Sequence, residues 1–428
     1  MSSNKKNNVL VKNTVWVLIG QGLRIIIQAA YFIYIARLLG VEGYGAFIST
    51  VALVAIISPF SGIGAGNLLI KNVSRDRTLF NIYWGNALLM TLISSILLLM
   101  LVMVLSQFLL PSSLSLKLIL LIAISDLFFA KVLDIGSQAF QAVQRLSYTA
   151  QLQILLSLFR MIGAVLLSVF NSRISVETWG YCYLFSTVIS ALIAVVCVCT
   201  VLGFPKLDYK RIKGEIKDGI YFSISFSAES IYSDIDKTML SRLSSLEAAG
   251  IYATAYRIID VAFTPVLALL RASYAKFFQY GTEGIRNTLT LIKKIFPLSL
   301  IYSILIAIIL YFVAPIFPKF LGEEYKHSVD AIRYLCLIPL FRSVSYFAAN
   351  ILTGCNYQGY RTTAQLISSG VNIVLNFVLI PKLSWIGAVI ACGTTNIFLS
   401  LLSWSLIWYL NSKTSKESNN EPKKHLIS

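Results

Sequence analysis

Charged residues are scarce in this chain of 428 residues. They make up 13% of the sequence, about half of the quarter that is usual in soluble proteins, whereas hydrophobic residues make up 57%. This balance excludes an ordinary soluble domain and favours an integral membrane protein. Apolar stretches of roughly 20 residues recur along the chain, and each is long enough to cross a hydrocarbon core of about 30 Å.

Histidine is nearly absent, and cysteine follows no metal-binding pattern. The two histidines, His327 and His425, stand far apart, and the six cysteines lie in or beside apolar stretches without zinc or disulfide spacing. We therefore expect no metal site. The sequence also lacks a P-loop motif, a Ser/His/Asp arrangement and the long outer loop that a membrane glycosyl polymerase needs. These absences favour a transporter without a cofactor over an enzyme.

The apolar stretches predict an all-α integral membrane fold of about twelve transmembrane helices. The first stretch follows Lys5, Lys6 and Lys12 and is too long for a signal peptide, so we expect a retained helix. We place the helices at 14–36, 46–70, 84–109, 116–140, 150–171, 178–202, 216–241, 248–273, 288–313, 329–353, 362–381 and 386–410. The predicted loops are short, and no soluble domain is inserted.

The formal net charge of +17 is unevenly distributed among the predicted loops. Both termini and every second loop are rich in Lys and Arg, whereas the loops on the opposite side hold few. The positive-inside rule explains this pattern and puts both termini in the cytoplasm, with an even number of helices. The basic charge therefore does not indicate a nucleic-acid partner.

A sequence repeat divides the chain into two similar halves. The matched residues are Arg37, Leu38, Glu42, Gly45 and Phe47 in the first copy and Arg242, Leu243, Glu247, Gly250 and Tyr252 in the second. We expect an N-terminal six-helix bundle over residues 1–205 and a C-terminal six-helix bundle over residues 206–428, which ends in a short polar tail. Because six is even, the halves enter the membrane in the same sense, as in transporters that bind substrate between parallel repeats.

Ionisable residues inside the predicted helices are the candidates for function. Each charge at the bilayer centre costs on the order of 3 kcal/mol, so it should face a partner or a water-filled cavity. Arginine in excess suits an anionic ligand, because its guanidinium group holds phosphate oxygens bidentately. The predicted substrate-binding residues are Gln21, Arg24, Gln28, Arg160, Arg257 and Arg342. For each arginine, the alternative is a structural ion pair or a side chain that snorkels to the membrane surface.

Four acidic residues are candidates for coupling transport to a proton or sodium gradient. They are Glu229, Asp234, Asp236 and Asp260. Glu229 lies 205 residues after Arg24, so the repeat places opposite charges at equivalent positions. For Asp234 and Asp236, the alternative is a local polar cluster with Lys237. A polar stripe on the eleventh helix is expected to line the same cavity; its members are Gln365, Ser369, Asn372 and Asn376.

Two segments resemble the polysaccharide transporter family, which includes O-antigen flippases. They are ARLLGVEGYGAF (Ala36 to Phe47) and DIDKTMLSRLSSLEAAGIYATAYRI (Asp234 to Ile258). That family belongs to the multidrug/oligosaccharidyl-lipid/polysaccharide exporter superfamily. The resemblance extends over essentially the whole chain and implies two six-helix bundles around a V-shaped cavity that alternates between inward-facing and outward-facing states.

The resemblance also implies a substrate, a location and partners. The substrate is an undecaprenyl-pyrophosphate-linked oligosaccharide, flipped from the cytoplasmic to the outer leaflet of the bacterial inner membrane for surface polysaccharide such as lipopolysaccharide O-antigen. Arg24 corresponds best to the basic residue that flippases of this superfamily carry in the first helix, and Arg257 corresponds less well. Membrane lipids, a polysaccharide polymerase and a chain-length regulator are the further partners implied.

Three alternatives stay open at this point. A drug/cation antiporter of the same superfamily would need an acidic or aromatic cavity, whereas the predicted cavity is basic. The sequence distinguishes poorly between an oligosaccharide flippase and a flippase for teichoic-type or cell-wall precursors, although relatives of the second kind often carry extra helices. A membrane polymerase or glycosyltransferase is disfavoured by the short outer loops.

Overall fold

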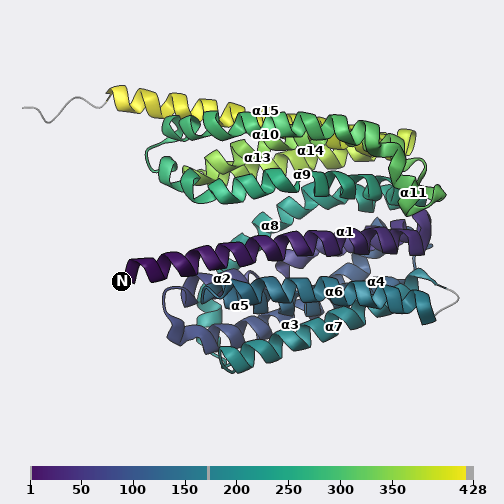
Figure 1. The fold of residues 1–428 in the computed structure, drawn as a ribbon, viewed down its shortest axis with the longest axis horizontal. Helices are drawn as coiled ribbons and strands as arrows, with labels where there is room; N and C mark the ends of the chain where they lie inside the picture. The colour runs from purple at the N-terminus through teal and green to yellow at the C-terminus, as the bar shows by residue number, and fades with distance from the viewer. Residues whose placement is uncertain (1, 171–173, 421–428) are drawn as a thin grey trace, which may run out of the picture. The chain divides into compact units, whose positions relative to one another are not determined.

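The computed structural model describes the backbone of residues 2–170 and 174–420. Within the helices, the side chains of residues 2–21, 23, 24, 209, 211–215, 218, 221, 222, 225, 229, 275 and 414–420 lie outside the described residues. The described residues form helices joined by short loops (Figure 1). They divide into unit 1, which comprises Met1–Gly250 with Lys319–Glu324, and unit 2, which comprises Ile251–Pro318 with Tyr325–Ser428.

Unit 1 contains the helices from the N-terminus to α8. They are α1 (Ser2–Ile57), η1 (Ser58–Phe60), α2 (Ala65–Val73), η2 (Arg77–Leu79), α3 (Phe80–Leu109), α4 (Leu116–Ile124), η3 (Ser125–Phe129), α5 (Ala130–Ala142), α6 (Leu146–Phe170), α7 (Val176–Val201) and α8 (Tyr209–Leu243). Its core lies between α2, α3, α5 and α7, around Trp84, Phe140 and Leu133.

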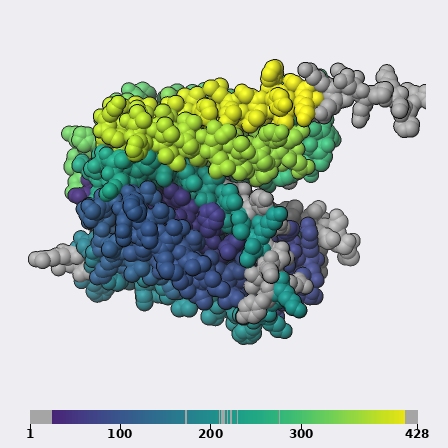
Figure 2. All heavy atoms as spheres, turned by 180° about the vertical axis from the view of Figure 1, so that it is seen from behind, coloured from purple at the N-terminus to yellow at the C-terminus, as the bar shows by residue number. Residues whose placement is uncertain are grey.

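The remaining helices lie mostly in unit 2, although the first turn of α9 and Lys319–Glu324, which covers most of α11 and of η5, belong to unit 1. They are α9 (Leu246–Gly281), α10 (Ile285–Val313), η4 (Ala314–Ile316), α11 (Phe317–Leu321), η5 (Glu323–Tyr325), α12 (Ser328–Leu335), α13 (Ile338–Gly354), α14 (Gln358–Leu383) and α15 (Trp385–Asn420). Its core is built on Phe263, Phe277 and Phe347. Figure 2 shows α14 and α15, in yellow-green and yellow, along one face of this unit.

α1 is broken at Gly40, four residues after the predicted end of the first helix at residue 36. Gly40 has φ 67° and ψ 175°, a conformation that favours glycine because a Cβ atom would be strained there. The helix resumes at Val41, whose backbone N–H donates to Glu324 Oε2 at 3.1 Å. The Glu324 carboxylate therefore caps the new helical start.

The second predicted helix, 46–70, is not continuous. The chain leaves the helix after Ile57 and passes through Ser58–Phe60, and positive φ angles at Gly62, Ile63 and Gly64 turn it before α2 begins. Pro59 disfavours a helical Ser58 and supplies no backbone N–H, which favours an interruption at this point. The prediction of one unbroken helix here is therefore wrong.

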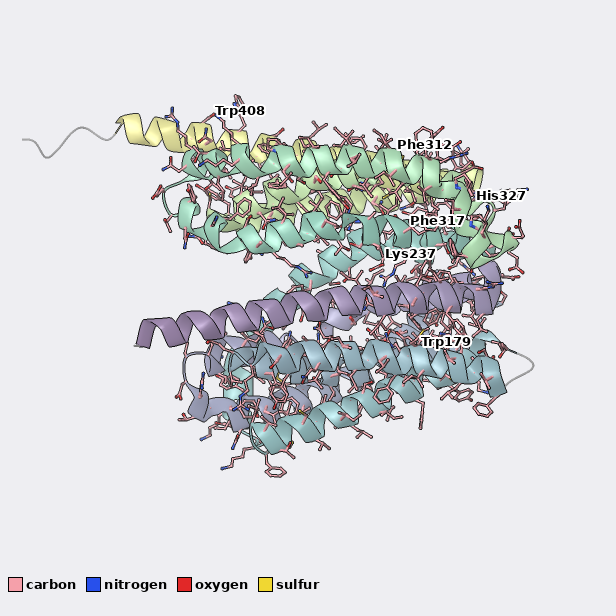
Figure 3. All side chains as sticks on the ribbon, in the orientation of Figure 1. Trp179, Lys237, Phe312, Phe317, His327 and Trp408 are labelled. Atoms are coloured by element: carbon pink, nitrogen blue, oxygen red, sulfur yellow. The ribbon has the colours of Figure 1, made fainter. Side chains whose placement is uncertain are left out.

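Eight helices in the part of the chain that the structure describes are long and apolar enough to cross a membrane, or nine if the bent pair α12 and α13 forms one span. The bend between α12 and α13 accounts for the difference between eight and nine, and three features separate nine from the twelve predicted helices. The two segments of α1 count as one helix, α4 and α5 are divided by the π-helical turn η3, and α8 is too polar. Outward-pointing apolar residues such as Phe312 and Trp408 (Figure 3) mark lipid-facing surfaces of a multi-pass membrane protein.

Candidate functional site

Arg160 on α6 forms an ion pair with Asp126 in the π-helical turn η3. Its Nη2 atom lies 3.2 Å from Asp126 Oδ1, and the two side chains are 18% and 17% exposed. Tyr183 on α7 donates to the same carboxylate at 3.0 Å, while its ring centroid lies 3.9 Å from the guanidinium carbon. Arginine, carboxylate and ring therefore stabilise one another inside unit 1.

Arg342 on α13 forms a second pair, inside unit 2. Its Nη1 atom lies 2.5 Å from Asp260 Oδ1 on α9. The rings of Tyr256, Phe263 and Tyr346 surround the guanidinium carbon, with centroids at 5.7, 4.9 and 5.8 Å. Tyr256, Asp260 and Phe263 share one helix face, so a single register of α9 presents acid and rings together.

These two pairs bear directly on the predicted substrate-binding set. The sequence shows no acid beside Arg160 or Arg342, whereas the structure supplies Asp126 and Asp260 from other helices. Asp260, which the sequence places near Arg257, instead binds Arg342. The geometry favours the ion-pair alternative for both arginines, and their binding of substrate stays a prediction.

Two residues of the polar stripe on α14, Asn372 and Asn376, are buried against neighbouring side chains. Asn372 and Asn376 are 1% and 0% exposed, and the Asn376 side chain donates to Asn372 Oδ1 at 2.8 Å. Asn372 in turn reaches Thr395 on α15 at 3.4 Å. The expectation of a water-facing stripe is wrong for these residues, because a polar side chain inside a membrane protein is equally well satisfied by a neighbouring helix.

Unit 1 contains a polar pocket of about 460 Å³, which we call the serine pocket. Its lining residues come from the broken segment after α1, from α2, from α5 and from α8. They are Ser58, Pro59, Gly64, Asn67, Lys131, Gln138, Ser223, Phe226, Ser230, Ser233 and Asp234. The break between Ile57 and Ala65 thus brings backbone and hydroxyl groups to one wall of the pocket. An unbroken apolar helix would present apolar side chains there.

The α5 wall of the serine pocket carries Lys131 and Gln138. These residues and Asp134 recur at i, i+3 and i+7, so they form one polar face of α5. Gln138 packs so closely on Gly66 of α2 that a Cβ atom there would lie 1.6 Å from Gln138 Oε1. Gly66 therefore permits the carboxamide to reach this wall.

The α8 wall carries hydroxyl groups and one acid. Lys237 Nζ lies 2.5 Å from Asp234 Oδ1, one turn along the helix (Figure 3 labels Lys237). Ser223 Oγ is buried and has no hydrogen-bond partner among the described residues. The Asp234 carboxylate is thus neutralised by Lys237, as in the predicted polar cluster, while the Ser223 hydroxyl stays available to a ligand.

The structure accounts for the other predicted residues only in part. The side chains of Gln21, Arg24 and Glu229 lie outside the described residues. Gln28 and Arg257 are half-buried, and Arg257 has no ion pair among the side chains that the structure describes. Asp236 is 2% exposed within α8. Lys131, Gln138 and Asn67 are not among the predicted binding residues, although the polar spacing along 131–138 within an apolar span indicates the first two.

The chain belongs to the polysaccharide biosynthesis protein family, whose model matches residues 10–274. An uncharacterized membrane protein of Methanocaldococcus jannaschii is 25% identical over 301 residues. That match covers 66% of this chain and 56% of the archaeal protein, so the chain spans only about half of that relative.

Three solved structures are similar in fold. An inward-facing multidrug resistance MATE family transporter of the MOP superfamily has a TM-score of 0.75 at 14% identity, covering 95% of this chain and 100% of that one. Lipid II flippase MurJ, in an inward closed conformation, has a TM-score of 0.70 at 13% identity, covering 92% and 87%. A MOP superfamily transporter from Pyrococcus furiosus has a TM-score of 0.64 at 14% identity, covering 94% and 96%. The family model therefore shows membership of the polysaccharide biosynthesis protein family, and the three structures show that the chain shares their fold.

Proposed function

We propose that the protein flips an undecaprenyl-pyrophosphate-linked oligosaccharide from the cytoplasmic to the outer leaflet by alternating access. Membership of the polysaccharide biosynthesis family supports a sugar-containing substrate. The observation that carries the proposal is the serine pocket, whose hydroxyl and carboxamide groups lie between helices of a membrane protein. Sugar hydroxyls donate and accept hydrogen bonds, and serine, asparagine and glutamine side chains do the same.

The charges around the pocket suit an anionic headgroup better than a cationic drug. Among the described lining residues, Asp234 is paired with Lys237. Lys131, which lies one turn from Asp134 on α5, is the lining cation that would contact an anionic headgroup. We propose that Lys131, Arg24 and Arg257 hold the pyrophosphate, and that Gln21 and Gln28 contact the sugar. The ion pairs with Asp126 and Asp260 favour structural roles for Arg160 and Arg342.

The topology that we propose has twelve spans in two six-helix bundles, residues 1–205 and 206–428, around a central cavity. The distribution of Lys and Arg among the loops supports both termini on the cytoplasmic side of a bacterial plasma membrane. The polarity of α8 supports its place as a span, because its serines and Asp234 line the serine pocket rather than a lipid-facing surface.

We further propose that a proton or sodium ion couples to transport through Glu229, Asp234, Asp236 or Asp260. Asp260 is 34% exposed on its side chain and Asp234 is 27% exposed, so an ion could reach either carboxylate. Binding there would compete with the ion pairs to Arg342 and Lys237. A polysaccharide polymerase and a chain-length regulator are the downstream partners that this function requires.

Two other functions share the fold. The TM-scores of 0.75 to a multidrug transporter and 0.70 to a lipid II flippase support a drug antiporter and a cell-wall precursor flippase as the alternatives. The experiment is lipid analysis of cells that lack the protein, complemented with wild type or with Arg24→Ala. In cells that lack the protein or carry Arg24→Ala, lipid-linked oligosaccharide should accumulate on the cytoplasmic leaflet and surface polysaccharide should be lost. The wild-type protein should reverse both effects. Normal polysaccharide with raised sensitivity to cationic drugs would favour the drug antiporter. Accumulated cell-wall precursor would favour the cell-wall precursor flippase.

A further inference from the structure

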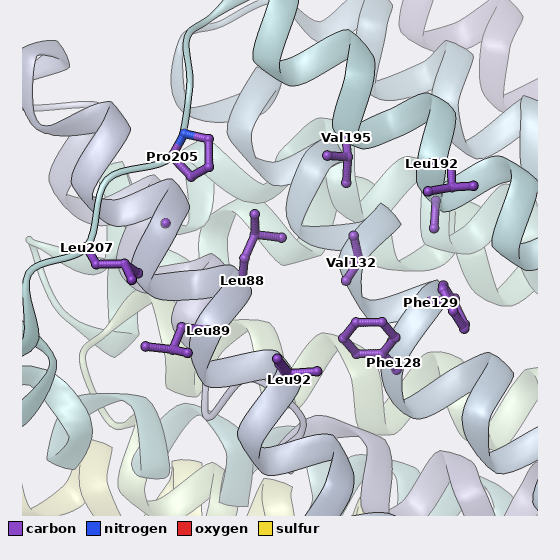
Figure 4. Close-up of a pocket in the computed structure, with 12 residues that line it drawn as sticks. Leu88, Leu89, Leu92, Phe128, Phe129, Val132, Leu192, Val195, Pro205 and Leu207 are labelled. Atoms are coloured by element: carbon purple, nitrogen blue, oxygen red, sulfur yellow. The ribbon is translucent and has the colours of Figure 1, made fainter.

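We propose that unit 1 binds one anionic phospholipid of the surrounding membrane at a site separate from the serine pocket. The site is an apolar groove of about 480 Å³ between α3, the η3–α5 segment and α7. Figure 4 shows its walls, with Leu88 and Leu92 from α3, Phe128 and Val132 from the η3–α5 segment, and Leu192 and Val195 from α7. We call it the lipid groove.

The walls of the lipid groove suit a hydrocarbon chain. Every side chain that lines it is apolar, although the neighbouring residue on α5, Lys131, lines the serine pocket. α5 therefore separates a polar site from an apolar one. Leu92 and Leu192 at the groove are 45% and 57% exposed, so a lipid tail enters sideways from the bilayer. An apolar groove open to hydrocarbon fills with an acyl chain rather than with water.

One end of the groove is bordered by the loop between α7 and α8, which is fixed on α3. The Lys206 backbone N–H donates to the Asn81 carbonyl at 2.8 Å. Asn86 Nδ2 donates to the Asp208 carbonyl at 3.1 Å, and the Asp208 N–H donates back to Asn86 Oδ1 at 2.9 Å. A Cβ atom at Gly85 would lie 2.1 Å from the Lys206 carbonyl oxygen, so glycine permits this close packing.

The fixed loop directs apolar residues into the groove and basic residues around it. Pro205 and Leu207 line the groove end (Figure 4), while Lys206 and Lys210 are exposed. Arg75 and Arg77 are also exposed, in the segment that leads into α3 at the same end.

Among the described side chains of these two segments, two acids accompany the four cations, and both accept hydrogen bonds from the backbone. Asp76 accepts from the Thr78 N–H at 2.9 Å, and Asp208 accepts from the Lys210 N–H at 3.1 Å. The net charge of these residues is therefore positive at the end of the lipid groove where the phosphate of a bound lipid would lie. Basic groups beside an intramembrane groove bind anionic headgroups. This charge complementarity selects an anionic glycerophospholipid over a zwitterionic one, whichever sugar the protein carries.

The test measures the thermal unfolding midpoint of the full-length protein, purified in detergent and washed free of lipid. Dioleoyl phosphatidylglycerol or dioleoyl phosphatidylcholine, which share acyl chains, is then added. We expect phosphatidylglycerol to raise the midpoint by several degrees more than phosphatidylcholine does. The double variant Lys206→Gln, Lys210→Gln should reduce the effect of phosphatidylglycerol to that of phosphatidylcholine. Leu192→Trp, which fills the groove, should lower the effect of both lipids.

Matched controls distinguish the groove from general lipid binding. Leu305→Trp introduces the same residue at a 54% exposed leucine on α10, and Lys382→Gln removes an exposed cation from α14. Both should respond to lipid as the wild type does. Equal stabilisation of the wild type by the two lipids would overturn the proposal. So would undiminished selectivity in the double lysine variant, or stabilisation by undecaprenyl phosphate but not by phosphatidylglycerol. Loss of flipping with intact lipid selectivity would count against the proposed function alone.

Discussion

Gly45 and Gly250, which occupy equivalent positions in the sequence repeat, pack backbone against backbone within unit 1. A Cβ atom on Gly45 would lie 1.8 Å from the Leu246 carbonyl oxygen, and a Cβ atom on Gly250 would lie 2.0 Å from that of Val41. Leu246 is itself the repeat equivalent of Val41, 205 residues later. The two copies of the motif therefore cross in a reciprocal contact that only residues without a side chain allow.

Replacing either glycine of this crossing with alanine should destabilise the protein strongly. The added methyl group would overlap a backbone carbonyl, so the two segments would have to separate. We expect Gly45→Ala and Gly250→Ala each to lower the thermal unfolding midpoint, and the double variant to lower it little further, since one displacement relieves both overlaps. Gly370→Ala is the control, because a Cβ atom there meets nothing within 4 Å. Equal midpoints for all three single variants would refute the crossing.

The pairing of Arg160 with Asp126 predicts a stability defect that a substrate-binding role does not. Arg160→Ala leaves a carboxylate inside the unit without its cation, and breaking a buried pair in this way costs about 3–5 kcal/mol. Removing both charges with Arg160→Met and Asp126→Leu should recover most of the loss. The measurement is the unfolding midpoint of the purified single and double variants. A single variant with wild-type stability and no transport would instead assign Arg160 to the substrate.

The sequence predicts much of the fold because its strongest signals are local. Apolar length locates the helices, and the repeated motif around Gly45 and Gly250 was found from spacing alone. The break after Ile57 was missed, because an apolar run through Phe60 and Ile63 hides a turn that depends on positive φ angles. The partners of Arg160 and Arg342 were missed for a different reason. They come from other helices, and helix periodicity does not specify which faces meet.

Glu229 is the residue through which we expect ion coupling to be tested most directly. Glu229→Gln keeps the size and the hydrogen-bonding capacity of the side chain but removes its charge, so it should block ion-driven turnover and spare substrate binding. The measurement compares binding and flipping in proteoliposomes with and without a proton or sodium gradient. Asp330→Gln serves as a control, because Asp330 is 55% exposed and pairs with Arg333 at 3.8 Å within one turn of α12. Flipping at an unchanged rate after collapse of both gradients would remove the coupling proposal.

Lys131 tests the serine pocket itself. It is half-buried on the polar face of α5, where Lys131→Gln retains a polar side chain of similar reach but removes the positive charge. We expect loss of most flipping, because a pyrophosphate in the pocket would lose its cation, while the unfolding midpoint stays within a few degrees of the wild type. Lys131→Arg should restore part of the activity, since the charge returns on a longer side chain. If Lys131→Gln flips the substrate normally while Arg257→Gln does not, the headgroup is held in unit 2, and the serine pocket has another role.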